Sequence, residues 1–207
     1  MKTIKIIIAS LSVLTGFSQS AVAQTKPLHL DVNYNYSMPI SAFKSDLVSN
    51  NSPRGFMAGI NYSFTDNLSA GIEFGFQDYY QQYPRALYPL GKTQEVSAVL
   101  TNSIQTTPVL LSAKYFPLPA SFIKPYVSLG AGGNIIDFNQ YLGEFGNGQT
   151  SIGFRAQGGL GILIPFGKFH SSGFNIGANY DYAPYNKNGY KDLNSVNLQA
   201  GIRIGLK

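Results

Sequence analysis

The chain has 207 residues, of which 12% are charged, and its formal net charge is +5. This charge is too small and too scattered to indicate nucleic-acid binding. The charged fraction is about half that of soluble domains, so something other than water is expected to cover one face of the fold. The absence of cysteine excludes a disulfide framework and a lipid-modified N-terminal cysteine.

Residues 1–23 have the features of a secretory signal peptide. Lys2 and Lys5 precede an apolar run, residues 6–17, and small residues ending at Ala23 form a cleavage site. The run is shorter than the roughly 20 apolar residues of a membrane-spanning helix, and no later stretch approaches that length. Residues 24–207 are therefore expected to be exported as one domain, with a net charge reduced to +3 by the loss of the two lysines.

Eight segments then alternate between apolar and polar residues, each about as long as a tilted strand that crosses a bilayer. Leu28 opens the first, and a tight turn at Asp66 and Asn67 joins the second to the third as a hairpin. The segments span residues 28–38, 56–64, 68–77, 109–115, 127–131, 152–164, 174–182 and 195–206. Their even number predicts an all-β fold, an eight-stranded antiparallel up-and-down transmembrane β-barrel.

The two faces of these strands differ in a way that favours a membrane barrel over a soluble one. The polar face is mostly Gly, Asn, Ser and Gln, which suits a crowded lumen, whereas a surface facing water is rich in charge. The apolar face carries aliphatic residues at mid-strand and Tyr or Phe near the ends, as lipid contact with aromatic girdles requires. We therefore expect four apolar positions to face lipid and three polar ones to face the lumen: Ile72, Leu111, Ile162 and Ile202, against Glu73, Ser112 and Arg203.

Loop lengths predict the orientation of the barrel. The connections after the odd strands are long, covering residues 39–54, 79–103, 139–150 and 183–194, so they are expected to face outward with both termini periplasmic. One strand has an irregular phase, since apolar residues are even-numbered up to Ile104 and odd-numbered from Val109. Because the intervening Pro108 cannot donate a ladder hydrogen bond, this change predicts a β-bulge.

The signal peptide, the eight alternating segments and the stretches TPVLLSAKYF (107–116) and KPYVSLGAG (124–132) resemble the small outer-membrane β-barrel domain family of the OmpX, OmpW and OmpA-membrane-domain type. The resemblance implies a monomeric, porin-like Gram-negative envelope protein. It also implies contact with lipopolysaccharide and phospholipid, and assembly by periplasmic chaperones and the barrel assembly machinery. One departure is the C-terminus, where such barrels often end in an aromatic residue and this chain ends Gly205-Leu206-Lys207.

Six charged residues are expected to face the lumen, three acids and three bases: Asp31, Glu73, Lys114, Arg155, Asp181 and Arg203. Unpaired buried charges are costly, so partners are required. Asp31 should pair with Arg203 across the seam between the first and last strands, and Arg155 should pair with Asp181, with Glu73 between the two groups. A gated ion path is the functional alternative, but a barrel of eight strands encloses little more space than its own side chains need.

Two further sets of residues have chemical potential. His170-Ser171-Ser172 has the His-x-Ser spacing of outer-membrane lipid A deacylases, but no glutamate lies a short distance downstream, and a solvated turn histidine is the simpler explanation. The other histidine, His29, is expected to bond to lumen neighbours. The second long loop carries five residues suited to protein or glycan contact: Tyr79, Tyr80, Tyr83, Arg85 and Tyr88. Alternatively, these tyrosines extend the aromatic belt on strands that continue above the membrane; both explanations remain open.

The sequence therefore favours a non-catalytic outer-membrane barrel with a structural or surface-interaction role through its loops. No cluster of His, Cys or carboxylates has metal-ligand spacing, and no cofactor is expected. Two alternatives remain: a narrow channel for small apolar solutes, as in OmpW, and a lipid A-modifying enzyme.

Overall fold

The computed structural model of the chain describes residues 28–89, 95–143, 145–166, 172–187 and 190–206, so the predicted signal segment lies outside the described residues. Eight long strands form the body of the molecule: β1 (Leu28–Pro39), β2 (Gly55–Ser63), β3 (Leu68–Gln82), β6 (Leu100–Tyr115), β7 (Lys124–Leu142), β8 (Phe145–Phe166), β9 (Ser172–Tyr182) and β12 (Ser195–Gly205). Among the described residues, no helix is long and apolar enough to cross a membrane.

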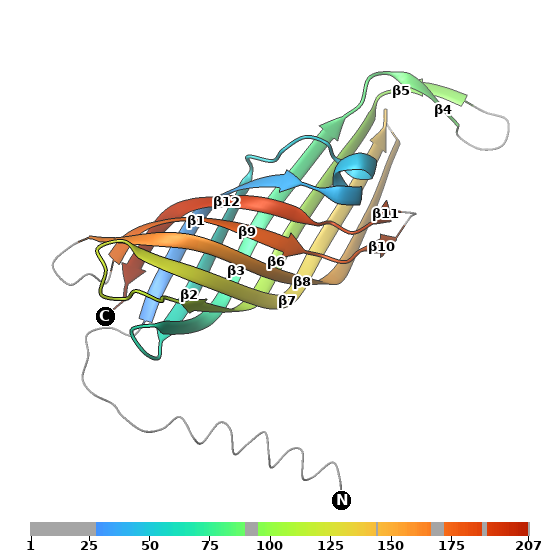
Figure 1. Cartoon of the computed structure of the whole chain (residues 1–207). Coiled ribbons are helices and arrows are strands. Elements are labelled where there is room, and N and C mark those ends of the chain that lie inside the picture. Colours follow the sequence, from blue (N-terminus) through green and yellow to red (C-terminus); the bar gives the residue numbers. More distant parts are fainter. Residues whose placement is uncertain (1–27, 90–94, 144, 167–171, 188–189, 207) are drawn as a thin grey trace, which may run out of the picture.

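The eight strands close into one antiparallel barrel in the order β1-β12-β9-β8-β7-β6-β3-β2 (Figure 1). Every strand pairs with its sequence neighbour, and β12 returns to β1 to close the ring, as an up-and-down barrel requires. At this seam Asp31 lies directly opposite Arg203. The predicted fold class is confirmed.

The two faces of the wall separate as the alternation predicts. Ile72 and Leu111 point outward with 56% and 70% of their surfaces exposed, whereas their strand neighbours Glu73 and Ser112 are buried inside. Exposed aromatic residues gather near both ends of the apolar wall: Tyr34, Phe56, Phe74, Phe154, Tyr180 and Tyr182 toward one end, and Tyr62, Phe64, Tyr115, Phe166 and Phe174 toward the other. This arrangement is the apolar belt between aromatic girdles that lipid contact demands.

The two ends of the barrel differ. At the terminus end, where β1 begins and β12 ends, residues 64–67 and 116–123 connect the strands. The loop end carries a π-helical turn, η1 (Phe43–Leu47), and two small hairpins: β4 (Ala86–Pro89) with β5 (Glu95–Ala98), and β10 (Asn186–Lys187) with β11 (Tyr190–Lys191). Figure 1 shows these elements together, away from the marked C-terminus.

One half of the wall is taller than the other. The β7–β8 ladder runs without interruption to the pair Leu142 and Phe145, so the long loop expected at residues 139–150 is wrong. In residues 139–150 both faces carry polar residues, so the sequence shows no alternation that would predict a strand. The backbones still pair, because pairing does not require a buried face. The neighbouring β9 pairs with β8 only from Ala156 onward, so the upper part of β8, from Phe145 to Arg155, has no strand on its second side in the described part of the chain.

The predicted β-bulge at Pro108 is also wrong. On one side β6 keeps a constant register with β7 through Pro108, which lies opposite Asn134, and on the other it keeps the same register with β3 above and below the proline. The even-numbered residues of β6 therefore face inward throughout. Ile104 points into the barrel instead of toward lipid, because an apolar cluster fills the loop end.

Candidate functional site

The lumen nearest the terminus end holds four of the six predicted charges in one chain of ion pairs. Arg203 donates two hydrogen bonds to Asp31, from Nε to Oδ1 at 2.7 Å and from Nη2 to Oδ2 at 2.9 Å. Lys114 lies between two acids, 2.7 Å from Asp31 and 3.0 Å from Glu73. All four side chains are buried, and the two acids balance the two bases.

The other two charges form a second group further toward the loop end. Arg155 pairs with Asp181, whose Oδ2 also accepts hydrogen bonds from Asn197 and Ser195. Gln157, which lies opposite Asp181 in the β8–β9 ladder, donates to Glu73 Oε2 at 2.8 Å. Glu73 and Gln157 therefore lie between the two groups. The structure places all six charges inside the lumen as two groups of buried ion pairs, one around Asp31 and one around Asp181.

An apolar plug, residues 43–48, closes the lumen at the loop end. Phe43, Leu47 and Val48 are buried, and the Phe43 ring meets Tyr79 edge-on with centroids 4.8 Å apart. Inward-facing side chains complete the cluster: Ile104, Ile136, Phe138, Ala183, Tyr185 and Leu193. The plug is tied down by Asn102 and Tyr83, which donate hydrogen bonds of 3.0 and 3.2 Å to the Leu47 carbonyl.

A smaller apolar cluster crosses the lumen at the terminus end. It consists of Phe116, Tyr126 and Leu163, all buried. The Tyr126 ring lies across Gly161, where an added Cβ would be 2.3 Å from the phenol oxygen, and its hydroxyl donates to Asn175 Oδ1 at 2.6 Å. Glycine is needed at this position because the ring approaches the backbone so closely.

Only part of the predicted loop-contact set lies on the loop surface. Tyr79 is wrong as a contact residue, because β3 continues through it and turns its ring inward, where its hydroxyl shares a hydrogen bond of 2.7 Å with Ser37. Tyr83 is half-buried against the plug. Tyr80 is exposed beneath Arg54, and Arg85 and the partly exposed Tyr88 lie on or near the β4 hairpin. The extension of β3 above the membrane therefore accounts for Tyr79 and Tyr80.

The predicted hydrolase-like triplet is not assembled into a site in the described part of the chain. His170 and Ser171 lie outside the described residues, while the Ser172 hydroxyl accepts a hydrogen bond from the Gly205 backbone N–H at 3.3 Å. His29 shares a hydrogen bond of 3.1 Å with Ser63. Among the described residues, no group of three or more His, Cys, Asp or Glu could hold a metal ion.

Sequence reasoning missed the plug and the aromatic closure at the terminus end. A signal for the plug was present: Phe43 and Leu47 are four residues apart in a mostly polar loop, which is the spacing of one helical face. A second signal was Ile104, Ile136 and Phe138, three apolar residues at lumen-facing positions of β6 and β7.

Comparisons with known proteins agree with this architecture. Residues 9–203 match the family model described as outer membrane protein beta-barrel domain. The crystal structure of Neisserial surface protein A superposes with a TM-score of 0.53 at 17% identity, covering 87% of this chain and 97% of that one. Ail of Yersinia pestis, in complex with the heparin analogue sucrose octasulfate, gives a TM-score of 0.48 at 19% identity, covering 87% and 100%.

OprG of Pseudomonas aeruginosa gives a TM-score of 0.47 at 15% identity, covering 87% of this chain and 95% of that one. No curated protein matches the chain. The structural likenesses concern the fold, whereas the family model spans most of the sequence. The chain belongs to the outer membrane protein β-barrel domain family.

Proposed function

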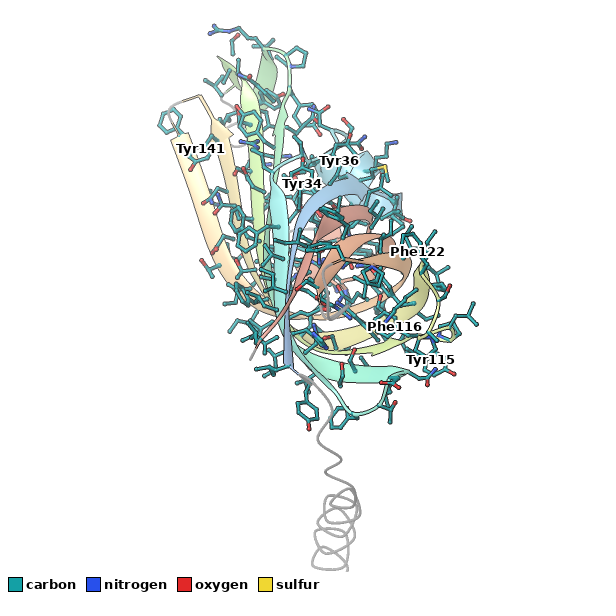
Figure 2. The ribbon with its side chains drawn as sticks, turned by 90° about the vertical axis from the view of Figure 1, so that its left-hand side faces the viewer. Tyr34, Tyr36, Tyr115, Phe116, Phe122 and Tyr141 are labelled. Carbon is teal, nitrogen blue, oxygen red and sulfur yellow. The ribbon has the colours of Figure 1, made fainter. Side chains whose placement is uncertain are left out.

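We propose that this protein is a non-catalytic component of the outer membrane whose loop end contacts a protein or glycan at the cell surface, with both termini in the periplasm. The observation that carries the proposal is the taller half of the wall, where the β7–β8 hairpin continues beyond the aromatic residues of the belt to Leu142 and Phe145. In Figure 2, Tyr141 of this hairpin lies far from Tyr115, which belongs to the aromatic girdle at the terminus end.

The exposed hairpin has the chemistry of a contact surface. Its β8 strand has no pairing strand on its second side from Phe145 to Arg155 in the described part of the chain, so part of its backbone is available to a partner. Edge strands are usually protected by charged residues, proline or a bulge. Residues 145–154 contain no charge and no proline. Such an edge can accept an extended segment of a partner by strand addition.

The contents of the lumen argue against the main alternative, a channel for small apolar solutes. A solute entering from the loop end would have to displace the plug, where Phe43 and Val48 have no exposed surface. It would then meet the two groups of buried ion pairs around Asp31 and Asp181, where an apolar molecule gains nothing and separates the charges. Tyr126 and Phe116 stand across the last part of the path.

The test uses the barrel in phospholipid nanodiscs on arrays of extracellular proteins and glycans. In the hairpin-trimmed variant, a two-residue Asn-Gly turn replaces residues 140–147. The flanking residues Asn139 and Gly148 are opposite each other, so the register is kept. In a matched variant the same turn joins Gln82 to Thr101, which removes the tyrosine-bearing loop and leaves the hairpin.

We expect binding by the wild type, loss of binding in the hairpin-trimmed variant, and no stable conductance of the wild type in planar bilayers. Retained binding after both trims would refute a role for the loop end. Stable conductance that falls when an apolar solute occupies the pore would instead assign the protein as a channel.

A further inference from the structure

The turn between β6 and β7, residues 116–123, is unusually apolar for a solvent-exposed connection. Leu118, Phe122 and Ile123 expose 58%, 77% and 46% of their surfaces, and residues 116–123 include no charged residue. The turn lies at the terminus end, opposite the proposed contact surface. An exposed group of large apolar side chains marks an interaction site.

The base of this turn is fixed by hydrogen bonds to the neighbouring turn and by one buried ring. Phe116 and Asn67 of the neighbouring turn exchange two hydrogen bonds of 2.7 Å, from the Phe116 N–H to the Asn67 carbonyl and from Asn67 Nδ2 to the Phe116 carbonyl. The Phe116 ring is buried against Tyr126, with centroids 5.6 Å apart. With one aromatic residue anchored inside the barrel, the apolar residues that follow it are left outside.

The exposed side chains continue the lipid-facing belt without a break. Tyr115, the last outward residue of β6, and Val127, an outward residue near the start of β7, are both exposed and flank the turn. At the adjacent β2–β3 turn, Phe64 and the first residue of β3, Leu68, are exposed as well. Figure 2 shows Tyr115, Phe116 and Phe122 gathered on the same side of the ring.

We propose that residues 118–123 insert into the lipid leaflet at the terminus end and anchor the barrel there, at the boundary between acyl chains and headgroups. Continuity with the belt selects lipid as the occupant, since Phe122 extends the apolar surface that Tyr115 and Val127 already present to the bilayer. A turn that served a periplasmic protein would instead extend into water, clear of the belt.

The chain contains no tryptophan, so a single Trp introduced at any position reports on that position alone. Three variants are compared: Phe122→Trp in the turn, Leu111→Trp at mid-belt, and Phe145→Trp at the tip of the β7–β8 hairpin. Leu111 and Phe145 are 70% and 65% exposed, so all three substitutions leave the packed interior untouched. Each folded variant is placed in phosphatidylcholine vesicles with or without bromine on the acyl chains.

Bromine quenches tryptophan only on contact with the acyl region. We expect the Phe122→Trp emission to be quenched, less than that of Leu111→Trp but clearly more than that of Phe145→Trp, with the opposite ranking for the aqueous quencher acrylamide. If Phe122→Trp is quenched no more by bromine than Phe145→Trp, the turn lies in water and the proposal fails. The result does not bear on the contact surface at the other end, whose own test is independent.

Discussion

The seam between β1 and β12 offers the sharpest test of the lumen network. Asp31→Asn, Arg203→Met and the double variant form a cycle in which the coupling energy measures the buried pair. Asp31 accepts four hydrogen bonds: two from Arg203 at 2.7 and 2.9 Å, one from Lys114 at 2.7 Å and one from Asn61 at 3.0 Å. Each hydrogen bond to a charged group contributes about 1.5–3 kcal/mol.

The two single variants should not cost the same. Breaking a buried pair by removing one partner costs about 3–5 kcal/mol. Arg203→Met should fall near the lower end, because Asp31 keeps Lys114. Asp31→Asn should fall near the upper end, because Arg203 has no second acid as a partner in the described part of the chain, and Lys114 keeps only Glu73. The double variant restores the charge balance, so we expect a coupling energy of about 2–3 kcal/mol.

The assay is urea unfolding of barrels refolded into bilayers, with the partly exposed pair Arg54 and Asp78 at the loop end as the control. Their atoms are 3.2 Å apart and the Arg54 side chain is 57% exposed, so that cycle should give about 0.2–1 kcal/mol. A seam coupling below about 0.5 kcal/mol would show that the two charges act independently. The pairing of Asp31 with Arg203 in the lumen would then have to be abandoned.

Three more predictions concern the wall, the plug and the terminus-end closure, all measured as changes in unfolding free energy. Ile72→Arg should destabilise the barrel by about 2–4 kcal/mol because it places a cation in lipid, whereas Leu87→Arg, on an exposed hairpin beyond the belt, should stay within about 0.5 kcal/mol. Phe43→Ala should cost about 3–5 kcal/mol through the cavity it leaves in the plug, and a smaller loss would mean that the plug is loosely packed. Gly161→Ala should cost about 1–3 kcal/mol, since its methyl group would meet the Tyr126 ring that reaches over it from the adjacent strand β7. Gly133→Ala, with nothing within 4 Å of the new atom, should be close to neutral, and equal effects at the two glycines would refute the steric explanation.

The strands within the membrane could be predicted from the sequence because each has lipid on one side and the lumen on the other. Because of this difference, apolar and polar residues alternate with a period of two along strands such as β1 and β12. Buried charges were predictable for a related reason: each needs a partner, and the register between the first and last strands limits the choice to near neighbours such as Asp31 and Arg203.

Beyond the membrane that difference disappears, and prediction failed. Residues such as Asn139 and Gly148 pair across β7 and β8 with polar groups on both faces, so no amphipathic signal remains. Ile104 misled for the opposite reason: it is apolar and faces inward, a placement that makes sense only once Phe43 is known to fold back into the barrel. The phase change at Pro108 therefore reflected what fills the lumen and not a change in register.

The plug also sets which loops evolution and protein engineers are free to change. Phe43, Leu47 and Val48 are packed inside the barrel mouth, so residues 40–54 are constrained in length and composition like a core segment even though they connect two surface strands. The tip of the β7–β8 hairpin carries no such packing constraint, because Gly146 is exposed, so a change there bears on partner binding and not on folding. A foreign epitope inserted at Gly146 would stand clear of the membrane with the barrel intact. The same insertion after Phe43 would displace the plug from the mouth of the barrel.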